Sequence, residues 1–338
     1  MAKVLGTLFP FVSTPVVLAP MATAGGGELV GAVASAGALG FLGAGYYSEV
    51  DLAKQVALAS AKAPPLQDGR LPYGIGLLVW RLGSKLIDAV IGTRPSAVWL
   101  SYGEADATAS WIKYIRERDS EISIATTANT LNEAYIAINE WKVDMLCVQG
   151  IEAGGHGLGS APPRDALLAA VLDAKLNPAV PVLAAGGVTD GRGIASVLVQ
   201  GATGAAVGTR FLVSNESLYS TAQKELLVAA SESDTIRSLA FDDARNTTGW
   251  PAGVDGRGLM SPTVHDYEKA AAEGTLDAEA DARRARYDAA VAAGETDRLV
   301  TWSGTGVGSI RSIRPAAELV ATLTADAAEA LACGARLL

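Results

Sequence analysis

The chain alternates between short runs of apolar residues and longer amphipathic or alanine-rich segments. A strand covered on both faces carries apolar side chains at nearly every position, so each short run predicts a buried β-strand. The predicted strands are Pro15–Ala19, Leu39–Gly43, Tyr73–Val79, Ala97–Leu100, Ile122–Thr126, Met145–Gln149, Val182–Ala185 and Ala205–Val207.

Segments with helical spacing separate these runs. They are Glu28–Ala36, Glu49–Ala61, Ala105–Arg118, Leu131–Trp141, Asp165–Lys175, Arg192–Gln200 and Leu218–Ser231. Apolar strands that alternate with helices predict a parallel sheet covered by helices. Eight such units in series favour an α/β fold of the (β/α)8 TIM barrel type over an open doubly wound sheet.

The pattern changes after about residue 240. Asn246–Gly253 is rich in turn residues, and a charged, alanine-rich helical stretch follows from about His265 to Ala293. Val300–Gly308 returns to a glycine-rich loop, and Pro315–Leu331 predicts a terminal helix with proline near its first turn. We therefore expect a barrel over residues 1–240, a helical lid or insertion over 241–300, and an active-site loop and terminal helix returning to the barrel over 301–338.

One of only two histidines in the chain, His156, lies on a glycine-rich turn directly after the apolar run 145–148. Glycines let the backbone approach a ligand closely, and imidazole is the side chain best suited to proton transfer near neutral pH. A histidine in a loop can also simply satisfy a backbone group. Its position at the end of a predicted barrel strand favours a functional role.

Two further glycine motifs follow the predicted seventh strand and enclose the eighth. They are Ala184–Val188 and Gly204–Phe211. Barrels frequently hold a phosphate with the loops after strands seven and eight. The N–H groups of Gly187, Gly208 and Thr209, with the Thr209 hydroxyl, suit a phosphate dianion and predict a phosphate site.

Composition and motifs exclude several other classes of function. The formal net charge of −9 argues against nucleic acid or an anionic membrane as partner. No apolar run approaches the roughly 20 residues of a membrane helix, and two cysteines fit a reducing, cytoplasmic compartment. No HExxH or CxxC spacing predicts a metal site, and no serine lies in a nucleophile-elbow context.

Four motifs, taken together and in this order, resemble the nitronate monooxygenase family, formerly called 2-nitropropane dioxygenases. The motifs are Ala19-Pro20-Met21, Gln149-Gly150-x-Glu152-Ala153-Gly154-Gly155-His156, Ala185-Gly186-Gly187 and Gly208-Thr209-Arg210-Phe211. The resemblance runs from about Pro15 to Phe211 and is weaker over Trp302–Val320. FMN-dependent enoyl-acyl-carrier reductases and related quinone reductases carry similar versions of the histidine motif.

The resemblance implies a TIM barrel that binds FMN non-covalently, with His156 facing a small-molecule substrate above the flavin. Gly76 stands where many relatives carry asparagine, so only its backbone can contact the flavin. The cofactor-binding residues that the resemblance implies are Ala19, Pro20, Met21, Gly76, Gln149, Gly154, Gly155, Gly186, Gly187, Val207, Gly208 and Thr209.

The implied reaction is the FMN-dependent oxidation of alkyl nitronates, or similar small carbanionic substrates, by molecular oxygen. His156 would deprotonate a neutral nitroalkane or orient an anionic nitronate. The alternatives are an FMN-dependent NAD(P)H reductase of an enoyl or quinone substrate, a flavin- or phosphate-binding protein without turnover, and a phosphosugar enzyme on the same barrel. The oligomeric state is left open.

Overall fold

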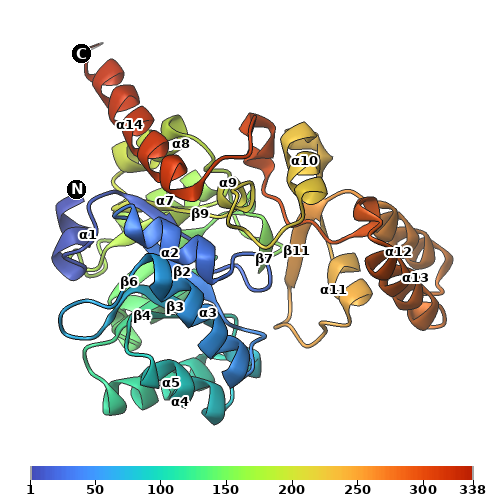
Figure 1. Ribbon diagram of the computed structural model, residues 1–338, viewed down its shortest axis with the longest axis horizontal. Helices are drawn as coiled ribbons and strands as arrows, with labels where there is room; N and C mark the ends of the chain where they lie inside the picture. Colours follow the sequence, from blue (N-terminus) through green and yellow to red (C-terminus); the bar gives the residue numbers. More distant parts are fainter. Residues whose placement is uncertain (1, 337–338) are drawn as a thin grey trace.

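The structure is a computed structural model that describes residues 2–336. Eight parallel strands close into a barrel in the order β1-β2-β3-β4-β5-β6-β8-β9, which confirms the predicted (β/α)8 fold (Figure 1). The barrel strands are β1 (Val16–Leu18), β2 (Leu39–Gly43), β3 (Leu71–Leu78), β4 (Pro95–Ser101), β5 (Ser123–Ala128), β6 (Met145–Gln149), β8 (Val182–Ala185) and β9 (Gly204–Val207). Every one overlaps a run predicted from the apolar pattern.

Large side chains fill the inside of the barrel. Phe41 and Trp99 meet edge to face with ring centroids 4.9 Å apart, and Met145 and Leu183 belong to the same buried cluster. Phe9, which follows the N-terminal helix α1 (Ala2–Leu8), joins this cluster as well. The interior is therefore a packed core, as expected for an eight-stranded barrel.

The helices that alternate with the strands form the outer layer of the barrel. They are α2 (Gly27–Ser35), α3 (Glu49–Lys62), α4 (Ser84–Gly92), α5 (Ala105–Arg118), α6 (Leu131–Tyr135) with the π-helical turn Ile136–Glu140, α7 (Arg164–Asp173), α8 (Gly191–Gln200) and α14 (Ala316–Ala335). The terminal helix α14 packs on α8 and α2 (Figure 1). The sequence pattern did not predict α1 and α4.

A second lobe lies beside the mouth of the barrel (Figure 1). It contains an antiparallel three-stranded sheet in the order β10-β11-β7. The lobe contains, in chain order, β7 (Gly155–Leu158), α9 (Thr209–Leu212), α10 (Thr221–Ala229), β10 (Thr235–Ser238), α11 (Ala240–Arg245), β11 (Val254–Leu259), α12 (Pro262–Glu273) and α13 (Ala280–Ala293).

The second lobe departs from the sequence pattern in two ways. Gly155–Leu158, predicted as a turn, is the strand β7, because its backbone pairs with β11 about 100 residues later. Residues 241–300 hold β11 as well as helices, so this segment is not wholly helical. Within residues 2–336, no helix is both long and apolar enough to cross a membrane.

Candidate active site

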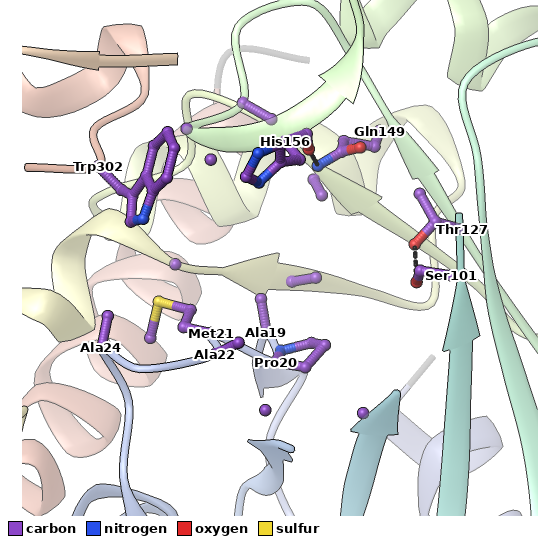
Figure 2. A pocket seen from close by; sticks show the side chains of 18 of the residues that line it. Ala19, Pro20, Met21, Ala22, Ala24, Ser101, Thr127, Gln149, His156 and Trp302 are labelled. Atoms are coloured by element: carbon purple, nitrogen blue, oxygen red, sulfur yellow. Dashed lines mark hydrogen bonds between the residues drawn. The ribbon is translucent and has the colours of Figure 1, made fainter. Parts of the chain in front are cut away.

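A cavity lies at the carboxyl ends of the barrel strands and encloses about 1300 Å³ of space, part of it open to solvent. The loop after β1 lies on one side of it, and His156 and Trp302 lie on the opposite side (Figure 2). Its lining includes the following predicted site residues: Ala19, Pro20, Met21, Gly76, Gln149, Gly154, Gly155, His156, Gly186, Gly187, Gly208 and Thr209. The structure therefore brings all but one of the predicted site residues together.

The exception is Val207, which does not line the cavity. Its side chain is fully buried in the core between strands and helices, whereas the neighbouring Ala206 does line the cavity. Successive side chains of a strand point to opposite faces, so only one of the two can face inward. The contribution of Val207 is its carbonyl, which accepts a hydrogen bond of 3.1 Å from the N–H of Ala19.

Glycines at two strand ends let the loop after β1 fold down over the barrel. A Cβ at Gly76 would lie 2.3 Å from Cβ of Pro20, and one at Gly43 would lie 2.4 Å from the Ala22 nitrogen. Side chains at these two positions would push Pro20–Ala22 out of place. Packing against Pro20 thus requires glycine at residue 76.

The two predicted phosphate turns lie beside a loop near the C-terminal end of the chain. Gly306 packs against the backbone of Gly187, and Thr209 Oγ1 accepts a hydrogen bond of 3.0 Å from the N–H of Gly304. The hydroxyl proton of Thr209 is still available to donate to an anion. A Cβ built at Gly208 would meet only Met21 Sδ, at 3.6 Å, so the backbone of Gly208 faces open space in the cavity.

A buried network fixes the amide of Gln149. Its oxygen accepts from Asn129 Nδ2 at 3.0 Å. Its Nε2 donates to the carbonyl of His156 at 3.2 Å, a bond drawn in Figure 2. The Tyr102 hydroxyl donates to the same carbonyl at 2.6 Å, and burial raises the pKa of this phenol. Gln149 therefore positions the histidine turn besides lining the cavity.

The imidazole of His156 is paired with a carboxylate that the sequence analysis did not identify. His156 Nε2 lies 3.0 and 2.9 Å from the two carboxylate oxygens of Asp242, and both side chains are about nine-tenths buried or more. Asp242 also accepts hydrogen bonds from Thr247 at 2.7 Å and from the indole of Trp250 at 3.1 Å. The carboxylate holds the proton on Nε2 and leaves Nδ1 able to accept one.

Aromatic rings enclose the histidine. The Trp250 ring stacks on the imidazole with centroids 3.6 Å apart and planes 12° from parallel. The Trp302 ring packs at a tilt against the imidazole, with centroids 4.9 Å apart. Tyr102 meets Trp250 edge to face, with centroids 5.3 Å apart. These rings fix the orientation of the imidazole and exclude water from it.

Four of the site residues that the sequence analysis missed come from one part of the chain, whereas Tyr102 and Asn129, also missed, come from the barrel. Asp242, Arg245, Trp250 and Trp302 all lie between residues 240 and 302, beyond the last barrel strand. The available signals were the acidic pair Asp242-Asp243 on a short helix and the tryptophan within the turn-rich stretch 246–253. Neither has a spacing that indicates contact with a residue 86 positions earlier in the chain.

Comparison with known proteins agrees with this geometry. The family model described as nitronate monooxygenase matches residues 86–326. Nitronate monooxygenase npaC of Metarhizium robertsii is 34% identical and covers 97% of this chain and 95% of its own length. A nitronate monooxygenase of Neurospora crassa is 31% identical over 96% of this chain and 92% of its own length.

Solved structures share the fold along the whole chain. A nitroalkane oxidase from Streptomyces ansochromogenes superimposes with a TM-score of 0.76 at 26% identity, covering 98% of this chain and 99% of its own. FabK from Thermotoga maritima has a TM-score of 0.81 at 24% identity, covering 100% and 99%, and shows likeness of fold alone. The family match and the curated relatives establish that this chain belongs to the nitronate monooxygenase family of flavin-dependent oxidoreductases.

Proposed function

We propose that this protein binds FMN in the barrel mouth and oxidises alkyl nitronates, or similar small carbanionic substrates, with molecular oxygen. The observation that carries the proposal is the pairing of His156 with Asp242 in the same cavity as the two glycine turns of β8 and β9. One end of the cavity then suits a phosphate, and another offers an oriented, partly desolvated imidazole.

The cavity fits FMN on two grounds. The backbone of Gly208 faces open space, and the N–H groups of Gly187, Gly208 and Thr209 would hold a phosphate there. Ala19, Pro20 and Met21 would form one wall for the flavin, opposite the histidine turn (Figure 2). When bound, FMN supplies the redox chemistry of the reaction.

The protein's own groups orient the substrate and move its proton. The carboxylate of Asp242 fixes Nε2–H, so Nδ1 of His156 is the ring nitrogen that would accept a proton from the α-carbon of a neutral nitroalkane. A preformed nitronate has already lost that proton, and His156 then only positions it. The rings of Trp250 and Trp302 keep water away from this transfer.

Three measurements on the purified protein test the proposal. The cofactor released by heat should run as FMN in chromatography, and FAD would contradict the proposal. Mixing the holoenzyme anaerobically with an alkyl nitronate should bleach the flavin absorption, and oxygen should restore it. Rapid bleaching by NADH together with no response to nitronate would instead support a reductase.

A further inference from the structure

The cavity contains a single formally charged side chain among the residues that line it. That side chain is Arg245, at the end of α11, and no aspartate, glutamate or lysine shares the lining. The protein as a whole carries a formal net charge of −9. A lone guanidinium in an otherwise uncharged cavity of an acidic protein favours an anionic ligand.

Helix α11 carries two charged groups near the site, but only the carboxylate has a full set of hydrogen-bond partners. Asp242 is bonded to His156, Thr247 and Trp250. Arg245, three residues later and so on the same side of the helix, makes no ion pair among the residues that the structure describes. Its single hydrogen bond is a long one of 3.4 Å to the Thr23 hydroxyl.

The neighbours of Arg245 place it between the loop after β1, which holds Thr23, and the ring of Trp302 on the histidine side of the cavity. Its guanidinium carbon lies 5.8 Å from the ring centroid of Trp302, and this ring packs on His156. The same guanidinium carbon lies 6.0 Å from the ring centroid of Tyr46. The glycine turns after β8 and β9 contact the loop around Gly304 instead.

We infer that Arg245 is the anion-binding residue of the substrate site and sets the preference for an ionised nitronate over a neutral nitroalkane. This inference rests on the proposed function. A nitronate carries its negative charge on two oxygens of one planar group, and the guanidinium fork matches two such oxygens with two N–H donors. A neutral nitroalkane gains much less from this contact.

Arg245→Met tests the inference, and Arg81→Met is its matched control. The Arg81 guanidinium lies 4.3 Å from the ring of Tyr46, so it is a nearby positive charge, but it is exposed and does not line the cavity. In Arg245→Met we expect KM for an alkyl nitronate to rise about 10- to 100-fold, since 1.4 kcal/mol corresponds to tenfold. KM for the neutral nitroalkane, FMN content and the circular dichroism spectrum should stay within about twofold, and Arg245→Lys should recover part of the loss.

Three results of these variants would overturn the inference. They are an unchanged nitronate KM in Arg245→Met, an equal rise in Arg81→Met, and loss of FMN from Arg245→Met. The last would mean that Arg245 binds the cofactor.

A binding measurement separates this inference from the proposed function. Nitrate is a planar anion that does not need to react, and calorimetry of the holoenzyme with nitrate reports binding without turnover. Nitrate binding that Arg245→Met weakens at least tenfold, in a protein that fails to oxidise nitronates, would support anion binding by Arg245 while contradicting the proposed reaction. Equal nitrate affinity in wild type and Arg245→Met would contradict the inference even if nitronates are oxidised.

Discussion

His156 Nε2 lies within 3.0 Å of both carboxylate oxygens of Asp242, a residue 86 positions further along the chain. The histidine lies on β7, shortly after the barrel strand β6, whereas the carboxylate lies on α11, beyond the last barrel strand. Burial of both side chains strengthens the interaction, because little water screens it. The orientation of the proposed base is thus set from outside the barrel.

Asp242→Asn should therefore impair proton transfer without emptying the cofactor site. The amide cannot stabilise a protonated imidazole as the carboxylate does, so flavin reduction by a neutral nitroalkane should fall about 10²- to 10⁴-fold. Reduction by the preformed nitronate should fall much less. Rapid-mixing absorption measurements of both reactions provide the check.

The adjacent carboxylate offers a matched control for that variant. Asp243 pairs with Arg283 at 2.9 Å and does not line the cavity. Asp243→Asn should lower stability and leave the ratio of the two reduction rates unchanged. A similar change of this ratio in both variants would mean that Asp242 acts on the fold of α11 and not on His156.

His156→Asn should separate the two forms of substrate in the same way. Asparagine keeps some hydrogen-bonding capacity but removes the titratable ring, so reduction by a neutral nitroalkane should fall about 10²- to 10⁴-fold while the nitronate reaction is largely retained. FMN content should remain near that of the wild type. A variant that loses FMN but reacts normally with both substrates when loaded would make His156 a structural residue of the cofactor site.

Gly208→Ala should weaken FMN binding without disturbing the fold. The new Cβ would meet only Met21 Sδ, at 3.6 Å, and would occupy space that a phosphate needs for close approach to the backbone. We expect at least a tenfold rise in Kd, about 1.4 kcal/mol, measured by flavin fluorescence on titration of the apoprotein. Gly83→Ala, where a Cβ meets nothing within 4 Å, is the control. Equal affinity in both variants would remove Gly208 from the phosphate site.

The barrel could be predicted because each of its strands has a recognisable apolar pattern in its own local sequence. An apolar run such as Met145–Gln149 is buried on both faces wherever it lies in a parallel barrel, so its pattern needs no knowledge of its neighbours. The strand β7 has no such signal. Its sequence Gly-His-Gly-Leu has low strand propensity, and only pairing with β11 makes it a strand.

The residues of the candidate site likewise fall into two groups, those that local sequence motifs predict and those that only long-range packing brings in. The glycine turns that would hold a phosphate follow their strands directly in sequence, so Gly187 and Gly208 could be found from local motifs. Arg245 reaches the cavity, and Asp242 reaches His156, only through the packing of a lobe whose path the pattern did not predict. Groups that recognise a substrate are commonly supplied by such long connections, whose contacts are not local.

The segment 241–300 should respond to ligand if it acts as the predicted lid. Trp250, within its turn-rich beginning, stacks on His156, so a ligand that orders the imidazole should also order residues 246–253. Limited proteolysis with mass spectrometry, with and without a nitronate under anaerobic conditions, should show slower cleavage there when ligand is present. Equal cleavage rates in both states would indicate a static insertion.

The barrel shell contains an ion pair whose contribution to stability should depend on pH. Arg70, just before β3, donates to both carboxylate oxygens of Asp119 at 3.1 and 2.8 Å, and this pairing lowers the pKa of Asp119. A lowered folded-state pKa contributes stability above the ordinary value of about 3.9, and the contribution is lost as pH falls through the folded-state pKa. Asp119→Asn should cost about 1.5–3 kcal/mol near pH 7 and progressively less below pH ~4.

Urea unfolding at several pH values measures this difference. Glu117→Gln is the control, because Glu117 makes only an exposed pair with Lys113 at 3.8 Å, and such pairs contribute about 0–1 kcal/mol. A cost for Asp119→Asn that does not change with pH would mean that the loss comes from packing and not from the charge.

Apart from β7 and α9, the second lobe leaves the barrel and rejoins it at one place. Ser214 and Arg314 form a parallel β-bridge, and the N–H of Asn215 donates to the carbonyl of Arg314 at 3.1 Å. The roughly one hundred residues between them therefore form an insertion between β9 and α14 whose two ends lie side by side. Insertions are tolerated best in this arrangement. Exchanging this segment between related barrels as one module would therefore replace Asp242 and Arg245, the residues proposed to act on the substrate, and leave the glycine turns of β8 and β9 unchanged.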